Sequence, residues 1–312
     1  MKKQFLAISV APILASLFLG CNNDPEKTTT KSTTISLELK SAFINGDSLH
    51  YVDVGKGEPV IFIHGTLGDY RVWLPHLDTF SKHYRVITYS RRYAYPNKQL
   101  INDSADYTAM PHANDLAAFI QSLNAGPVHL VGHSYGAYTA LITTMKHPEL
   151  VKSCVLGEPP VAPLLMKVPG GDTIAAKFFS VAKPAGDAFK SGNDEKAVSL
   201  FTGWVLGDTN SYKNVAPEIR SVMLSNTLEL RGAVLSTKPF PELTCDDMKK
   251  INTPVLLMEG EKTTSFFSTI TDEIHKCLVN KEKVTLPGAS HKLQMENPSD
   301  FNKIVLAFID KH

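Results

Sequence analysis

The strongest constraint on the fold of this chain is a regular alternation between two kinds of segment. Short apolar segments typical of β-strands occupy residues 59–64, 85–90, 128–132, 151–157, 254–260 and 283–286. Amphipathic patterns typical of helices occupy residues 113–123, 135–146 and 299–311. This alternation predicts an α/β fold with a mostly parallel sheet and helices on both faces. Two more strand-like segments, 35–44 and 48–54, flank an Asn-Gly turn and predict an edge hairpin, which makes eight strands.

The alternation is interrupted between residues 161 and 243. Helical patterns follow one another there without strands, at residues 173–181, 194–206 and 217–231. We therefore predict a helical cap at 161–243, inserted after the sixth strand, over the carboxyl ends of the strands where open α/β sheets bind ligands. Residues 36–160 and 244–312 are the predicted core.

The N-terminus has the pattern of an export signal. Lys2 and Lys3 precede an apolar stretch at residues 5–20, which is too short and interrupted for a comfortable membrane span. The stretch runs into the sequence FLGC, which resembles the lipidation box of bacterial lipoproteins and ends at Cys21. The alternative is an ordinary signal followed by a cysteine at that place by chance.

The lipoprotein resemblance implies a signal peptide at residues 1–20 and a lipid on Cys21. The mature protein is then expected to be exported and anchored to a bacterial membrane, on its periplasmic or cell-surface face. Residues 22–34 contain no aliphatic side chain, so residues 21–35 are predicted to form a flexible tether to the folded domain.

Charge and motif content exclude several classes of partner. The chain has 32 lysines and arginines against 31 aspartates and glutamates, so it lacks the basic excess of a nucleic-acid binder. It contains no HExxH motif, no cysteine and histidine spacing of a metal site and no Walker A motif. We expect no nucleic-acid partner, no metal and no cofactor.

A candidate nucleophile lies between a predicted strand and a predicted helix. The sequence GHSYG at residues 132–136 is a G-x-S-x-G motif in the context that a nucleophile elbow requires, a sharp turn that exposes Ser134. The alternative is a glycine-rich turn with an incidental serine.

Two other loops provide candidate partners for Ser134. The sequence HGTL at residues 64–67 follows a buried strand, and its Thr66 N–H, with that of Tyr135, is predicted to form an oxyanion hole. His291 lies in the loop after the last strand, from which it can reach the serine as a general base. The alternatives are an ordinary turn and a surface histidine.

Taken together, these motifs resemble those of the α/β-hydrolase superfamily, most closely its small capped esterases, lactonases and haloperoxidase-like enzymes. The resemblance covers residues 36–312 and implies the α/β-hydrolase fold. In that family the acid of the triad usually lies three residues after the glycine that ends the seventh strand. Here Gly260 leads to Thr263 at that position, which offers no carboxylate.

Two glutamates can replace the missing acid. Glu158 ends the 151–157 strand, where some family members carry their acid, and Glu261 begins the loop after Gly260. We favour Glu158, whose place before two prolines fixes its backbone. The remaining alternatives are Glu261 and no acid at all.

The resemblance implies a cofactor-free serine hydrolase that acts on small carboxylic esters or lactones through an acyl-enzyme. A serine nucleophile disfavours the dehalogenases and epoxide hydrolases of the superfamily, whose alkyl-enzyme ester needs a carboxylate. The alternatives are cleavage of C–C or amide bonds, perhydrolysis, or a catalytically inactive ligand-binding lipoprotein, which Thr263 motivates.

The sequence allows two interpretations for several further side chains. Arg91 and Arg92 could bind a substrate carboxylate, but more often such residues pair with loop carboxylates such as Asp69. Cap residues are expected to form cap core, and a few could line an apolar acyl pocket: Phe178, Phe179, Phe201, Trp204, Met223 and Leu224. Cys154 is expected in the core, and whether Cys245 and Cys277 pair stays open.

Overall fold

The computed structural model of the chain describes residues 37–97, 99–100, 105–236, 240–241 and 243–312. The predicted signal peptide, Cys21 and the tether therefore lie outside the described residues. In the part that is described, no helix is long and apolar enough to span a membrane. The same residues contain no cluster of three or more His, Cys, Asp or Glu side chains that could hold a metal ion.

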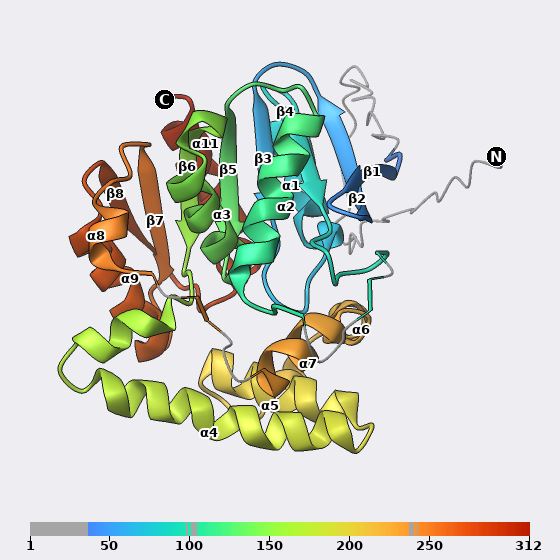
Figure 1. The fold of residues 1–312 in the computed structure, drawn as a ribbon, viewed down its shortest axis with the longest axis vertical. Helices are drawn as coiled ribbons and strands as arrows, with labels where there is room; N and C mark the ends of the chain where they lie inside the picture. Colours follow the sequence, from blue (N-terminus) through green and yellow to red (C-terminus); the bar gives the residue numbers. More distant parts are fainter. Residues whose placement is uncertain (1–36, 98, 101–104, 237–239, 242) are drawn as a thin grey trace, which may run out of the picture. The chain divides into compact units, whose positions relative to one another are not determined.

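The centre of the fold is a sheet of eight strands in the order β1-β2-β4-β3-β5-β6-β7-β8 (Figure 1). The strands are β1 (Lys40–Ile44), β2 (Asp47–Gly55), β3 (Pro59–Ile63), β4 (Arg85–Tyr89), β5 (Val128–His133), β6 (Val151–Gly157), β7 (Val255–Gly260) and β8 (Lys281–Leu286). The hairpin strands β1 and β2 pair antiparallel at one edge, and all pairs from β4 to β8 are parallel. The predicted mostly parallel, eight-stranded sheet is confirmed.

Both faces of the sheet are buried because successive side chains of a strand point to opposite faces. In β3, Ile61 and Ile63 pack on one face with α2 (Ala109–Ser122), α3 (Tyr135–Lys146) and α9 (Ser265–Cys277). Val60 and Phe62 pack on the other face with α1 (Leu74–Phe80) and α11 (Pro298–Ile309). In Figure 1, α2 and α3 lie in front of the sheet. Helices therefore cover both faces, as predicted.

Between residues 158 and 244, the described residues form helical elements and no strand. They are η3 (Ala162–Lys167), α4 (Gly171–Lys190), α5 (Asp194–Leu206), η4 (Ser211–Asn214), α6 (Pro217–Leu224) and α7 (Thr227–Leu235). Helices α4, α5 and α7 lie together beyond one end of the strands (Figure 1). The helix predicted at 217–231 is two helices, because the chain leaves helical geometry at Asn226. We call η3 to α7 the helical segment.

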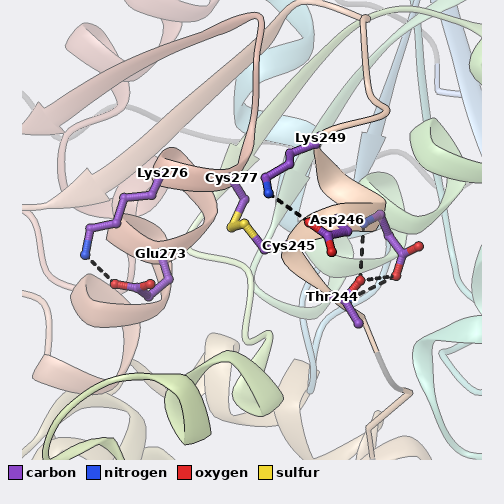
Figure 2. The surroundings of a disulfide bond; sticks show 8 residues. Thr244, Cys245, Asp246, Lys249, Glu273, Lys276 and Cys277 are labelled. Carbon is purple, nitrogen blue, oxygen red and sulfur yellow. Dashed lines mark hydrogen bonds and ion pairs between the residues drawn. A yellow bond between two sulfur atoms is a disulfide. The ribbon is translucent and has the colours of Figure 1, made fainter.

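A disulfide bond joins Cys245 to Cys277, a pairing that the sequence left open (Figure 2). It ties the start of α8 (Cys245–Met248) to the end of α9, two helices that the sequence patterns did not predict. Thr244 and Asp247 form a capping box at the start of α8. Cys154 is a buried free thiol in β6, as expected for a core residue.

Candidate active site

Ser134 occupies a strained turn between β5 and α3. Its φ of 53° and ψ of −123° lie outside the regions that side chains normally adopt. The turn closes only because two glycines flank it: a Cβ on Gly136 would lie 2.2 Å from the carbonyl oxygen of Ile63, and one on Gly132 would lie 2.6 Å from the Cα of Ala137. This geometry is that of a nucleophile elbow.

The order of the strands explains which residues meet beside this turn. Glu158 follows β6, Thr263 follows β7 and His291 follows β8, and these three strands are consecutive neighbours beyond β5. Since parallel strands present their carboxyl ends at the same edge of the sheet, the loops after them converge there.

Glu158 is fully buried and its carboxylate contacts three donors. Oε2 contacts Nδ1 of His291 and accepts a hydrogen bond of 2.9 Å from the hydroxyl of Thr263, while Oε1 accepts one of 2.7 Å from the N–H of Gly260. Such hydrogen bonds offset the cost of removing a carboxylate from water. Thr263, at the position where the family usually has its acid, therefore supports the carboxylate that comes from the next strand.

The structure brings Glu158, and not Glu261, to His291. The carboxylate of Glu261 accepts a hydrogen bond of 2.7 Å from the N–H of Gly288, and this residue is exposed. Of the two glutamates considered from the sequence, only Glu158 lies in position to orient the imidazole.

The imidazole ring of His291 is enclosed by two other rings. Phe267 of α9 stacks on it with 3.7 Å between centroids and 17° between planes. The ring of His133 lies 4.8 Å away, and Nε2 of His133 is 2.6 Å from the carbonyl oxygen of His291. Sequence reasoning missed these contacts, because the only signal for them is that His133 adjoins Ser134 in the motif.

Ser134 lines a cavity beside the turn. Within the described residues its hydroxyl makes no hydrogen bond to His291; in hydrolases without substrate this bond is often long and tightens when substrate binds. A Cβ on Gly65 would lie 3.0 Å from the Cβ of Ser134, so the turn at residues 64–67 packs directly against the elbow. Thr66 and Tyr135, the predicted oxyanion residues, line the same cavity as Ser134.

This cavity has a volume of about 300 Å³ and an apolar wall. Residues of the helical segment supply most of the wall, with others from α9 and the adjoining loops: Pro160, Phe178, Phe179, Val181, Ala182, Ala185, Phe201, Trp204, Val205, Leu230, Ala233, Val234, Ser236, Phe240 and Phe267. Among the described residues that line it, none carries a charge. Four of the six cap residues singled out from the sequence are in this wall, whereas Met223 packs inside the helical segment and Leu224 is exposed.

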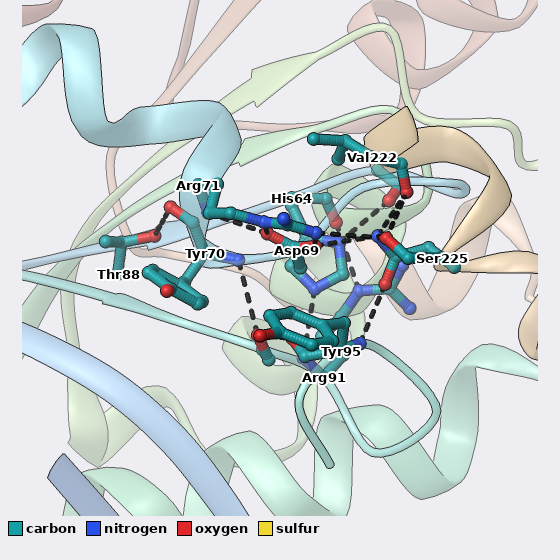
Figure 3. Close-up of polar contacts among 12 residues, drawn as sticks. His64, Asp69, Tyr70, Arg71, Thr88, Arg91, Tyr95, Val222 and Ser225 are labelled. Carbon is teal, nitrogen blue, oxygen red and sulfur yellow. Dashed lines mark hydrogen bonds and ion pairs between the residues drawn. The ribbon is translucent and has the colours of Figure 1, made fainter. Parts of the chain in front are cut away.

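The arginines near the site are engaged in ion pairs. Arg91 is buried against Glu229 of α7, and Arg92 makes two hydrogen bonds of 2.7 Å with Asp115. Asp69, suggested from the sequence as a partner of these arginines, instead binds Arg71, as Figure 3 shows. The reading of Arg91 and Arg92 as ion-pair residues is therefore the one that the structure supports. The partner differs because Asp69 lies in the same turn as Arg71.

Three histidines near the site, the buried His64 and His112 and the partly buried His133, have lowered pKa values. Burial, with the nearby charge of His291, lowers the pKa of His133 to about 3. Burial, with the charge of Arg91, also lowers the pKa of His64 and of His112 well below the usual value.

We expect these histidines to make the fold sensitive to mild acid. Each pKa is lower in the folded protein than in the unfolded chain, so below about pH 6.5 the unfolded chain binds more protons. The free energy of unfolding should therefore fall as pH drops below about 6.5, by up to about 1.4 kcal/mol per pH unit for each histidine. Urea denaturation at pH 7.5, 6.0 and 5.0 measures this slope.

A matched pair of variants identifies the histidine responsible. His133→Gln removes one titrating group, so it should reduce the pH dependence of the free energy of unfolding by up to about 1.4 kcal/mol per pH unit. His83→Gln, at an exposed position, should leave this pH dependence unchanged. Equal free energies of unfolding at pH 7.5 and 5.0 would contradict the assignment.

Comparisons with known proteins identify the family of the chain. Residues 58–298 match the family model of the alpha/beta hydrolase fold. A protein of Mycobacterium tuberculosis with the provisional name non-heme bromoperoxidase BpoC is 37% identical over 287 residues, which cover 84% of this chain and 97% of the relative. The (E)-2-((N-methylformamido)methylene)succinate hydrolase of Acinetobacter baylyi is 24% identical, over 85% of this chain and 95% of its own length.

Among solved structures, an esterase of Thermogutta terrifontis superimposes with a TM-score of 0.71 at 19% identity, over 88% of this chain and 98% of that one. At this identity the likeness concerns the fold alone. The family model covers more than half of the chain, and the relative from M. tuberculosis matches 84% of it. The chain belongs to the alpha/beta hydrolase family, whose members are hydrolases.

Proposed function

We propose that this protein is a serine hydrolase that cleaves small, uncharged carboxylic esters or lactones through an acyl-enzyme. The observation that supports this most is the contact of the buried Glu158 carboxylate with Nδ1 of His291, beside the elbow that carries Ser134. A carboxylate on Nδ1 leaves Nε2 as the nitrogen that can take a proton.

In the proposed mechanism, Ser134 Oγ attacks the substrate carbonyl as His291 Nε2 takes the hydroxyl proton. Glu158 stabilises the imidazolium, and the N–H groups of Thr66 and Tyr135 bind the oxyanion of the tetrahedral intermediate. The intermediate expels the alcohol, which receives the proton from His291, and leaves an ester on Ser134. Water, deprotonated by His291, then attacks this ester, and His291 returns the proton to Ser134 Oγ as the carboxylic acid leaves.

The contacts of Glu158 argue against the alternative of an inactive binding protein. That alternative was motivated by Thr263 in place of an acid, yet the Thr263 hydroxyl donates a hydrogen bond to Glu158. The site thus contains a carboxylate that comes from a different strand.

The lining of the cavity favours a substrate with an uncharged, apolar acyl group. Its wall is apolar, and the neighbouring cations Arg71, Arg91 and Arg92 are already paired with carboxylates. A substrate carboxylate would thus be buried without a counter-ion, which costs several kcal/mol. The A. baylyi relative is named for a succinate substrate, and we propose that this chain differs from it.

The first test concerns the triad. Ser134→Ala should abolish labelling by a fluorophosphonate probe and hydrolysis of p-nitrophenyl butyrate, since it removes the hydroxyl that forms the acyl-enzyme in the proposed mechanism. Glu158→Gln should lower kcat by roughly 10³-fold or more, because the imidazole loses its orienting charge. Glu261→Gln, one loop away, is the matched control and should keep kcat within about twofold of wild type.

Two results would overturn the triad proposal. One is wild-type protein that stays unlabelled while its fold is intact. The other is a loss of kcat in Glu261→Gln but not in Glu158→Gln, which would assign the acid to the other glutamate.

The second test compares two esters of equal length. We expect kcat/KM for p-nitrophenyl hexanoate to exceed that for mono-p-nitrophenyl adipate, which ends in a carboxylate, by roughly a hundredfold, equivalent to about 2.7 kcal/mol. Ala182→Arg places a cation in the cavity wall and should narrow the difference. Equal values of kcat/KM for the two esters in the wild type would refute the uncharged acyl pocket.

We also propose that Cys21 carries a lipid that anchors the exported protein to a bacterial membrane. Its support is the sequence pattern at residues 18–21, together with the Cys245–Cys277 disulfide, a bond typical of proteins outside the cytoplasm.

The anchor is tested by membrane fractionation of cells that express the full chain. Cys21→Ser should move the protein to the soluble fraction, because the thiol that would carry the lipid is gone. Cys154→Ser, at a cysteine inside the core, is the control and should stay with the membranes. A Cys21→Ser protein that remains in the membrane fraction argues against lipidation.

A further inference from the structure

We propose that His64 and Arg91 are positioning residues for the oxyanion turn, residues 64–67, and that Glu229 of the helical segment holds Arg91 in place. The inference rests on the proposed function, because it assigns these residues to the turn whose Thr66 N–H binds the oxyanion. We call this set of residues the His64–Arg91–Glu229 chain.

The first link joins Arg91 to both the backbone and the ring of His64. His64 follows β3 and Arg91 lies just beyond β4, its neighbour in the sheet. The Nε–H of Arg91 donates to the carbonyl oxygen of His64 at 3.0 Å, and the backbone N–H of Arg91 donates to Nε2 of His64 at 2.9 Å. Figure 3 shows the two side chains together.

The second link runs from the His64 ring to the next peptide. Since Nε2 accepts a hydrogen bond, the proton of the neutral ring lies on Nδ1, and burial keeps the pKa of His64 low enough for the ring to stay neutral. The Nδ1–H donates to the carbonyl oxygen of Gly65 at 2.8 Å, and the N–H of Gly68 donates to the same oxygen at 3.2 Å.

These bonds fix the orientation of the Thr66 N–H. The C=O of Gly65 and the N–H of Thr66 belong to one planar trans peptide, so they point in opposite directions. Two donors hold the Gly65 carbonyl, and Thr66 lines the cavity beside Ser134. An oxyanion donor contributes most when its direction is set before the charge develops, which is what this arrangement provides.

The third link places the counter-ion in the helical segment. The guanidinium of Arg91 is 1% exposed, and both of its terminal nitrogens donate to the carboxylate of Glu229, Nη2 at 2.6 Å. The guanidinium also lies 5.2 Å from the ring centroid of Tyr135, the second oxyanion residue. Arg91 does not line the cavity, so its donors serve the protein and not a substrate.

A separate set of bonds fixes the start of α7, the helix that carries Glu229. Asn226 precedes α7, and its Nδ2 donates to Asp69 at 2.7 Å while its Oδ1 accepts from the N–H of Tyr95 at 2.7 Å. Asp69, which comes just after the oxyanion turn, is also bound by Arg71 (Figure 3). The turn and α7 are thus joined at two places.

The test compares two neighbouring ion pairs, the buried Arg91–Glu229 pair and the partly buried Arg92–Asp115 pair. Arg91→Lys keeps the charge but loses the Nε–H donor and the paired bonds to Glu229. Arg92→Lys makes the same change in the Arg92–Asp115 pair, which makes no hydrogen bond or ion pair with the turn among the described residues. We expect Arg91→Lys to lower kcat for p-nitrophenyl butyrate by about 10- to 100-fold with KM within about threefold, and Arg92→Lys to change neither by more than about twofold.

Three further measurements separate positioning from general damage to the fold. Glu229→Gln should lower kcat in the same direction but less, since an amide still accepts one of the two bonds. His64→Asn, whose amide nitrogen lies near the place of Nδ1, should retain more kcat than His64→Leu. The pH midpoint of kcat/KM should be unchanged in Arg91→Lys, because Glu158 and His291 are untouched.

The amide resonance of Thr66 in NMR spectra gives a readout that needs no activity. It should shift in Arg91→Lys and Glu229→Gln and stay in place in Arg92→Lys. Equal shifts in the two lysine variants, or equal losses of kcat, overturn the His64–Arg91–Glu229 chain whether or not the wild type is an esterase. A wild type without Ser134-dependent turnover, in contrast, overturns the proposed function, and the Thr66 resonance then still decides the structural claim.

Discussion

The buried carboxylate of Glu158 is the interaction on which the candidate site depends. It joins the loops that follow β6, β7 and β8 through Thr263, Gly260 and His291. Removing one partner from such a buried set leaves an uncompensated charge, at a cost of about 3–5 kcal/mol. The carboxylate therefore restrains all three loops, and the position of the His291 imidazole depends on these contacts.

Burial of charge recurs on the other side of the elbow, where Arg91 and Glu229 meet. A buried ion pair adds little stability relative to well-packed apolar side chains, because desolvation offsets most of the attraction. The Arg91–Glu229 pair instead fixes the orientation of its partners, since a guanidinium donates its hydrogen bonds in one plane. The two charged sets thus restrain the two halves of the proposed machinery, the base at β8 and the oxyanion turn at β3.

Sequence patterns predicted the features that depend on neighbouring residues. Strand and helix periodicity predicted the parallel sheet, and the glycines around Ser134 predicted the turn, because each is dictated by local sterics. Glu158 could be predicted as a candidate acid for a related reason. It follows a predicted strand, and parallel strands bring their carboxyl ends together. The break between α6 and α7 was missed because Asn226 is held there by Asp69 and Tyr95, which are distant in sequence.

Pairings across the molecule could not be predicted in the same way. Nothing near Glu229 distinguishes it from a solvated helix residue, and the partner of Arg91 was therefore sought among nearby loop carboxylates. The bond between Cys245 and Cys277 depends on how α8 and α9 pack, which spacing along the chain does not contain. The hydrogen bond from Thr263 to Glu158 could not be predicted for the same reason. A threonine at the usual position of the acid suggests that the catalytic carboxylate is missing, until the contact with Glu158 is known.

The helical segment makes two different contributions to the site. It supplies most of the apolar wall of the cavity, and through Glu229 it supplies the counter-ion of the residue that holds the oxyanion turn. Leu230, next to Glu229 on α7, lines the cavity, so one helical turn faces both the acyl group and the guanidinium. A displacement of α7 by a bulky acyl group would therefore act on Arg91 as well. In the proposed mechanism, the choice of substrate and the alignment of the oxyanion donors would be coupled, because the same helix carries both contacts.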